Sequence, residues 1–266
     1  MADTLPLSTA DALALLFFII SWVAYGYAVD SKLVGRISLT QAMDAQREAW
    51  MHTMARRELR MIDTGIMAGL QQGTAFFASS TLIALGGCFA LLGATDRVLA
   101  VLSDLPYFTQ PARGVLEMKT IGLIMLFAYA FFKFGWSYRL FNYCSILVGA
   151  VPVMRDGAGH AAEIETAVRR AARMNILAGR HFNAGLRGVF FSIGYLGWFV
   201  SPGVLVASTI LLLIVLARRQ FFSAARRAVI EPQPSTGRRE NRVDIASEPV
   251  AGEPDPFADS DRRDLQ

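Results

Sequence analysis

Two cationic side chains stand inside an apolar stretch of this sequence, among other groups that can form hydrogen bonds. The stretch is residues 131–143 (FFKFGWSYRLFNY). Its candidate functional side chains are Lys133, Trp136, Ser137, Arg139, Asn142 and Tyr143. An ionised side chain at bilayer depth costs roughly 2.5–3.5 kcal/mol on insertion scales, so such cations usually face protein, a partner or a water-filled cavity. This cluster is the strongest functional lead in the sequence.

The cluster has three interpretations. On a helical wheel Lys133 and Ser137 share one face, and the other four members gather on the adjacent face. We favour a structural or scaffold role, in which Lys133 and Arg139 pair with the candidate acids Glu58 and Asp63. One alternative is an anion-selective channel or transporter, because rings of basic side chains favour anions. The other is binding of an anionic phospholipid headgroup at a cytoplasmic boundary.

Catalytic, metal and cofactor chemistry find little support. The sequence has three histidines and two cysteines, Cys88 and Cys144, and both cysteines lie in apolar stretches. No spacing pairs its carboxylates for acid–base work or gives a nucleophile its base. We therefore expect no catalytic residue, metal or cofactor, and an enzyme is the disfavoured class.

The composition is that of a membrane protein. Of 266 residues, 53% are hydrophobic and 18% charged, whereas soluble domains average about 25% charged residues. The formal net charge is +4, and the basic residues flank apolar spans without forming a separate domain. The bilayer, with anionic lipid headgroups as a candidate ligand, is thus the expected partner, and no nucleic acid is expected.

Four apolar segments are expected to cross the membrane, at about residues 10–29, 73–93, 118–151 and 188–216. The third would be about 50 Å long as a helix, so it must tilt, project from the bilayer or break near Gly135. Pro202 interrupts the fourth and should kink or break it. A kinked full span is favoured, and a re-entrant hairpin is the alternative.

Two arginine-rich segments, residues 30–72 and 152–188, have helical spacing and are expected to form amphipathic helices on the cytoplasmic side. Four spans would then place the C-terminus outside. Yet Arg218, Arg219, Arg226 and Arg227 directly follow the last span, which argues that it stays inside. We divide the chain into a helical membrane domain, residues 1–230, and a disordered tail, residues 231–266, which is rich in Pro, Arg, Asp and Glu.

Three glycines precede the second segment at strict four-residue spacing: Gly65, Gly69 and Gly73. Small residues on one helix face allow a neighbouring helix to approach closely. The spacing predicts a packing seam, either within the chain or between subunits of a homo-oligomer.

Several uncommon motifs in order resemble one known family. They are residues 50–63 (WMHTMARRELRMID), 76–81 (FFASST), 133–149 (KFGWSYRLFNYCSILVG) and 179–187 (GRHFNAGLR). The chain resembles, over about residues 10–227, an uncharacterised integral membrane family catalogued as domain of unknown function five-nine-nine. The resemblance implies a multi-pass helical protein of the bacterial inner membrane. It carries no established activity, so it assigns no functional residue.

Overall fold

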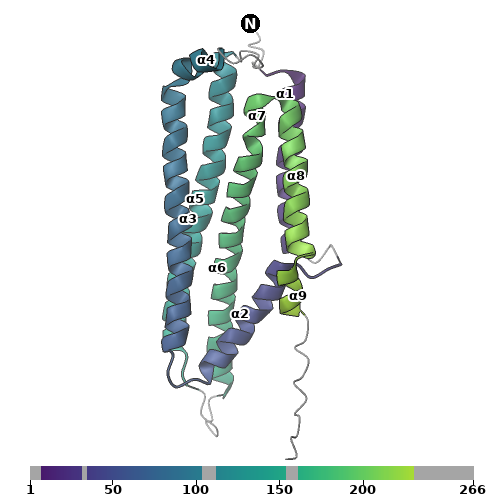
Figure 1. Cartoon of the computed structure of the whole chain (residues 1–266). Coiled ribbons are helices and arrows are strands. Elements are labelled where there is room, and N and C mark those ends of the chain that lie inside the picture. The colour runs from purple at the N-terminus through teal and green to yellow at the C-terminus, as the bar shows by residue number, and fades with distance from the viewer. Residues whose placement is uncertain (1–6, 32–34, 104–111, 154–160, 231–266) are drawn as a thin grey trace, which may run out of the picture. The chain divides into compact units, whose positions relative to one another are not determined.

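The structure is a computed structural model that describes residues 7–31, 35–103, 112–153 and 161–230. Its described secondary structure consists of helices, most of which run side by side along one long axis (Figure 1). The predicted all-α architecture is confirmed, and four of these helices are long and apolar enough to cross a membrane. Residues 231–266, for which the sequence predicts disorder, lie outside the described part of the chain.

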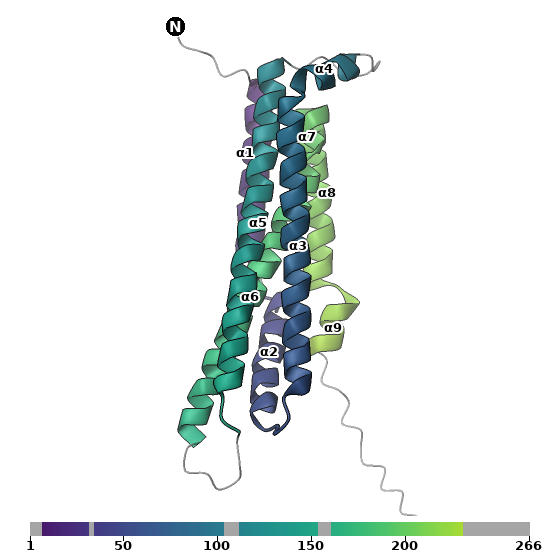
Figure 2. The same ribbon diagram turned by 90° about the vertical axis from the view of Figure 1, so that its left-hand side faces the viewer.

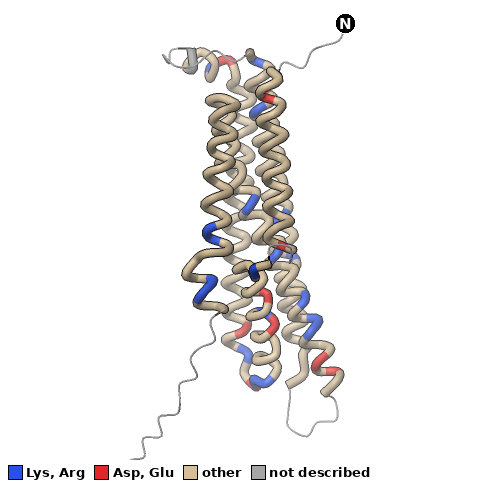
Figure 3. Tube along the Cα trace, turned by 90° about the vertical axis from the view of Figure 1, so that its right-hand side faces the viewer, with Lys and Arg blue, Asp and Glu red and all other residues tan. Residues whose placement is uncertain are grey.

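The chain runs between the two ends of the bundle in successive long helices. α1 (Thr9–Asp30) and α2 (Leu39–Ala55) lead away from the end where α4 (Thr95–Ser103) lies (Figures 1 and 2). α3 (Met61–Gly93) returns to that end, and α5 (Arg113–Ala150) leads away again. We call the two ends the α4 end and the arginine-rich end, because Figure 3 shows most Lys and Arg residues toward the latter.

The second half of the chain forms a helical hairpin. α6 (Ala161–Tyr195) rises to the α4 end, the short α7 (Gly197–Val200) forms the turn, and α8 (Pro202–Phe221) descends beside α1 (Figure 1). α9 (Ala224–Ile230) follows at the arginine-rich end and packs against α2.

The prediction of a kinked single span over residues 188–216 is therefore wrong. The chain reverses direction at Ser201, where Pro202 begins α8 and the Ser201 hydroxyl accepts a hydrogen bond from the amide of Val204 at 3.2 Å. Proline at a helix start loses no hydrogen bond, because the first turn has no intrahelical acceptor for its amides. Neither arm is the short half of a re-entrant loop, since α6 has 35 residues and α8 has 20.

This hairpin resolves the conflict over the C-terminal arginines. α6 and the α7 turn accompany α1, from an ion pair between Arg187 of α6 and Asp30 to a hydrogen bond between Trp198 of α7 and Asp11. The chain thus traverses the bundle along α1, α3, α5, α6 and α8. After five traversals Arg218 and its neighbours lie at the arginine-rich end, where the sequence requires them.

The helices have two different lengths, which divide the bundle into two zones. α1 has 22 residues, or about 33 Å, close to a hydrocarbon core of about 30 Å. α5 has 38 residues, about 57 Å, so it extends well beyond α1. α5 is unbroken through Gly135, so the break that was one of the three expectations for this segment does not occur. The excess lengths of α3, α5 and α6 surround α2 at the arginine-rich end (Figure 2).

The described end of α5 has a clear cause. Proline cannot continue a helix, and Pro152 follows directly on Val151. The guanidinium of Arg60, at the start of α3, donates to the carbonyl oxygens of Val148 at 2.9 Å and Pro152 at 3.2 Å. These bonds satisfy acceptors that have no intrahelical partner.

Each zone has its own apolar core. Near the α4 end, aromatic side chains of α1, α6 and α7 pack together, with Phe18 lying 5.6 Å from Phe191 and 5.4 Å from Tyr195 between ring centroids. At the arginine-rich end, Met51 and Met54 of α2 pack against α3, α5 and α6. The predicted amphipathic segments are therefore helical, and both lie at the same end.

The predicted glycine seam does not close within the single chain. A Cβ atom added at Gly65, Gly69 or Gly73 would meet no atom within 4 Å among the described residues. Of the two alternatives that the sequence left open, a close partner helix is not present among the described residues, and a contact between subunits stays a prediction. Close approach occurs instead at Gly122 and Gly185, where an added Cβ would lie 2.0 Å from Tyr195 Oη and 2.7 Å from Phe134 Cε1.

We predict that Gly197→Val destabilises the bundle, because the turn before α8 has no room for a side chain. A Cβ at Gly197 would lie 2.7 Å from Ser208 Oγ and 2.9 Å from the carbonyl oxygen of Val204. Overpacking of this kind costs about 1–3 kcal/mol, so thermal unfolding in detergent should occur at a lower temperature. The matched control is Gly65→Val, which should unfold close to wild type. Equal unfolding temperatures for the two variants would contradict the described turn.

Candidate functional site

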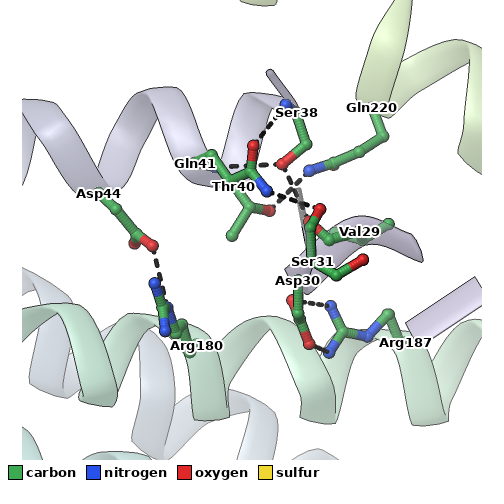
Figure 4. Close-up of polar contacts among 10 residues, drawn as sticks. All are labelled: Val29, Asp30, Ser31, Ser38, Thr40, Gln41, Asp44, Arg180, Arg187 and Gln220. Carbon is green, nitrogen blue, oxygen red and sulfur yellow. Dashed lines mark hydrogen bonds and ion pairs between the residues drawn. The ribbon is translucent and has the colours of Figure 1, made fainter. Parts of the chain in front are cut away.

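A network of charges joins the corner between α1 and α2 to α6 (Figure 4). Asp30 at the end of α1 accepts two hydrogen bonds from Arg187, at 2.8 and 3.2 Å. Asp44 on α2 accepts one from Arg180 Nε at 3.0 Å. We call these four residues the charge junction. Seven residues separate the two arginines, so both lie on one face of α6, and each finds an acid from a different helix.

Hydrogen bonds fix the backbone on which the acids stand. Ser38 and Gln41 form a capping box at the start of α2. The Ser38 hydroxyl also donates to the carbonyl oxygen of Val29 at 3.1 Å, and the Gln41 amide donates to that of Ser31 at 3.0 Å. Gln220 of α8 donates to the Thr40 hydroxyl at 2.7 Å (Figure 4). The capping box thus does more than start a helix, since it also holds α1 and α2 together.

Burial changes the ionisation of the α2 side chains. It raises the pKa of the Asp44 carboxyl, although the bond from Arg180 acts in the opposite direction. It also lowers the pKa of Arg47, which is attracted by Asp44 but forms no ion pair with a described acid. Arg47 donates instead to Asn175, a fully buried residue of α6, and lies 5.9 Å from the ring centroid of Phe141. A half-buried cation without a counter-ion favours an anionic ligand.

Lys133 lines a cavity of about 700 Å³, here called the Lys133 cavity. It lies between α1, α5 and α6, and its other polar walls come from Asp30, Tyr129, Arg180, His181 and Arg187. The Lys133 ammonium lies 5.3 Å from the ring centroid of Tyr129. Nδ1 of His181 is buried and has no hydrogen-bond partner among the described residues.

The structure separates the predicted cluster into different environments. The ring of Trp136 meets His181 edge-on at 6.4 Å, so Trp136 stays near Lys133. Ser137 is fully buried and donates to the carbonyl oxygen of Ala178 at 2.8 Å. Asn142 accepts from Gln71 of α3 at 2.8 Å. These last two therefore serve helix packing.

Arg139 and Tyr143 form a separate surface pair. Arg139 Nε donates to the Tyr143 hydroxyl at 2.7 Å, and both side chains are exposed. Tyr143 thus accepts a hydrogen bond from Arg139, as the sequence predicts, but the pair lies outside the Lys133 cavity.

The depth of Lys133 differs from the expectation of a mid-bilayer cation. Gly26, Tyr27 and Asp30 line the same cavity, so Lys133 lies beside the last turns of α1. Arg139 is six residues further along α5, or about 9 Å. Both cations are central in a long helix, but that helix extends beyond the membrane-length zone. Lys133 thus lies beside the end of α1, at the edge of the membrane-length zone.

The candidate acids have other partners. Asp63 is fully buried, and its Oδ1 accepts from Arg57 and from the indole of Trp50, each at 2.7 Å. Asp63 is a charge partner, but of Arg57 and not of Lys133 or Arg139. Glu58 is exposed. The predicted pairing rested on the position of these acids just before the second apolar segment. Asp63 instead pairs with Arg57, which lies six residues away in the short connection between α2 and α3.

Sequence reasoning missed an intrahelical lysine near the α4 end. Lys119 of α5 is 7% exposed, and its ammonium donates to the carbonyl oxygen of Trp198 at 2.8 Å and lies 3.9 Å from Asp11 Oδ1. The Trp198 indole donates to the same carboxylate oxygen at 2.7 Å. The signal was Lys119 near the start of the third apolar segment and Asp11, the single acid of the first, because charges in apolar spans need neutralising partners.

The described residues offer no group of three or more His, Cys, Asp or Glu side chains that could hold a metal ion. Cys88 and Cys144 are free and buried. The arrangement supplies cationic and aromatic groups around cavities, which suits noncovalent binding of anions.

Comparison with known proteins supports the resemblance noted above. The family described as "Protein of unknown function, DUF599" matches residues 13–225. Neither a curated protein nor a solved structure matches the chain.

We predict that removing one member of the buried pair Arg57–Asp63 destabilises the protein more than removing both. Arg57→Leu leaves Asp63 buried with a single remaining donor, Trp50. The expected loss is about 3 kcal/mol, the low end for a broken buried pair because Arg57 is 38% exposed. The double variant Arg57→Leu/Asp63→Leu should lose less, in unfolding monitored by circular dichroism in detergent. Additive losses would show that the two groups do not interact.

Proposed function

The chain belongs to this family of proteins of unknown function, and we propose that it is a structural protein of the bacterial inner membrane that holds an anionic phospholipid headgroup in the Lys133 cavity. The observation that carries the proposal is the boundary position of Lys133, whose ammonium has no acidic partner among the described side chains. The scaffold role and the lipid role, separate alternatives in the sequence, become one role at this site.

The arrangement of basic residues supports the location and orientation. Lys and Arg gather at the arginine-rich end, and such residues are retained on the cytoplasmic side of inner-membrane proteins (Figure 3). The five traversals then leave the start of α1 outside and the end of α8 inside. All basic segments thereby satisfy the same rule.

Headgroup binding is supported by the chemistry of the Lys133 cavity. Arg180 and Arg187 are neutralised by Asp44 and Asp30, so Lys133 contributes the unmatched positive charge. Trp22 and Tyr27 line the cavity too, and such rings favour the headgroup level of a membrane. His181 Nδ1 adds a polar atom without a partner. A phosphate at this depth would meet a cation and ring edges without displacing an existing ion pair.

Anion permeation is less well supported by the same geometry. Beyond Lys133 toward the α4 end, the helices enclose Phe18, Phe191, Tyr195 and Trp198, each at most 2% exposed. The cavity of about 470 Å³ beside these rings is lined by apolar and aromatic side chains and holds no basic group. An anion pathway needs basic or polar groups along its whole length. The described conformation instead has an aromatic core between the two charged ends.

We predict that Gln46→Cys and Thr166→Cys, in a background lacking Cys88 and Cys144, are protected from a membrane-impermeant maleimide in intact cells. Both positions lie in the arginine-rich zone, on α2 and α6. Arg97→Cys on α4 is the matched control and should be labelled. Labelling of Gln46→Cys or Thr166→Cys before lysis would overturn the orientation.

We predict that Lys133→Met weakens retention of phosphatidylglycerol at least about tenfold, because one charge-assisted contact is worth roughly 1.5–3 kcal/mol. The measurement is native mass spectrometry of protein from neutral-detergent micelles with defined added lipid. Arg139→Met is the matched control on the same helix, since Arg139 lies outside the cavity. Equal retention by wild type and Lys133→Met, or equal loss in both variants, would count against the Lys133 cavity as the headgroup site.

A further inference from the structure

A second cavity, of about 330 Å³, lies inside the bundle where α1, α2, α3, α6 and α8 meet. We call it the arginine cavity, because Arg47, Arg187 and Arg219 line it. It shares only Arg187 with the lining of the Lys133 cavity, and it opens between other helices. None of its distinctive residues belongs to the cluster singled out in the sequence.

The arginine cavity has more positive than negative charge. Asp44 is the acid in its lining, and Asp44 is bound to Arg180, which lies outside it. Arg187 is bound to Asp30. Neither Arg47 nor Arg219 forms an ion pair with a described acid, and Asp44, the acid that attracts Arg47, is bound to Arg180. Burial lowers the pKa of Arg47, although the charge of Asp44 acts in the opposite direction.

Aromatic rings and a buried amide position the two unmatched guanidinium groups. Arg47 donates to Asn175 and lies near the ring of Phe141. Arg219 lies 5.9 Å from the ring centroid of Phe190. Both contacts hold an arginine in place and leave most of its donors without an acceptor. A planar guanidinium with free donors suits bidentate binding of a carboxylate or phosphate.

The opposite wall is apolar and has free space. Gly69 and Gly73 of α3 line the cavity, and an added Cβ at either would meet no atom within 4 Å. Leu70, Phe182 and Leu186 extend this wall. Gly69 and Gly73, which were predicted to pack against another helix, thus face an empty space. A single hydrocarbon chain could occupy this space.

We propose that the arginine cavity binds an amphiphilic anion, a carboxylate or phosphate attached to an apolar body. The anionic group lies by Arg47 and Arg219, and the apolar body lies against α3 at Gly69 and Gly73. The ligand can come from the bilayer, as a fatty acid, or from solution, as a small amphiphilic acid. This inference goes beyond the headgroup site and uses different residues.

The first test is thermal unfolding of the full chain in neutral detergent with laurate, dodecanol, acetate or inorganic phosphate. Laurate should raise the unfolding temperature in a saturable manner, because a ligand that binds the folded state stabilises it. Dodecanol should not, because it lacks the charge, and acetate and phosphate should not, because they lack the apolar body. A shorter acid, octanoate, separates the sources: binding equal to that of laurate indicates a soluble acid, and much weaker binding indicates a membrane fatty acid.

Variants then locate the ligand. Gly73→Leu should fill the apolar wall and abolish the laurate response, whereas Gly65→Leu, on the same face but outside the lining, should keep it. Arg219→Gln should weaken the apparent affinity for laurate at least about tenfold, and Arg218→Gln should not. If Gly73→Leu fails to fold, the comparison of Arg219→Gln with Arg218→Gln still tests the proposal. An unchanged laurate response in Arg219→Gln, or an equal response to dodecanol, would overturn the proposal.

Lys133→Met keeps the two proposals apart. It removes the cation of the headgroup site and leaves the arginine cavity intact, so its laurate response should match wild type. Loss of the laurate response in Lys133→Met would place laurate in the Lys133 cavity and refute the arginine cavity as its site.

Discussion

The pairing of two α6 arginines with acids from α1 and α2 is the constraint on which the rest of the bundle depends. Arg180 and Arg187 stand on a helix that must run alongside α1, where an unpaired cation would face apolar surroundings. Asp30 and Asp44 neutralise them at 2.8 and 3.0 Å. Because Asp30 ends α1 and Asp44 belongs to α2, the same contacts fix the turn between the two helices. The path of α6, and so the reversal into α8, follows from this junction.

The charge junction also explains where the cavities lie. Arg187 lines both of them, and its bond to Asp30 passes between the two. Arg187 and Asp30 are committed to their ion pair. Lys133 in one cavity and Arg47 and Arg219 in the other form no ion pair with a described acid, so they remain for ligands. If every cation were paired with an acid, neither cavity would carry excess positive charge, and neither would attract an anion. The surplus of arginine in the composition is thus local, and it lies at the boundary of the membrane-length zone.

The sequence predicts the elements far better than their arrangement. The periodicity of residues 9–30 and 113–150, together with their apolar character, suffices for α1 and α5, and Ser38 and Gln41 suffice for the start of α2. The fifth traversal was not predictable by the same criteria, because Arg180, Asn183 and Arg187 interrupt the apolar pattern of α6. Their neutralisation requires Asp44 and Asp30, which lie 136 and 157 residues away in sequence. A hydropathy average over a short window cannot identify a partner so distant in sequence. Pro202 gave a correct signal for a break, but the physical outcome, a helix start after a reversal, depends on the packing of α7 against α8.

The candidate site shows the same division between local and distant information. Lys133 was identified correctly as a cation that needs protein around it, because its cost in an apolar span depends only on its own segment. Its depth was misjudged, because depth is set by where α1 ends, which is visible only when the two helices are side by side. Asp11 and Lys119, at the opposite end of the same helices, were overlooked for the converse reason. Asp11 is the single charge of the first apolar segment and Lys119 is one of three cations in the third, and only their meeting at Trp198 shows that they form a second charged contact. Charged contacts therefore tie α1 to α5 and to the α6–α7–α8 hairpin at both ends of the membrane-length zone, with an aromatic core between them. α3 packs mainly against α5 and α4, outside this frame, so its glycine face is left as the open wall of the arginine cavity.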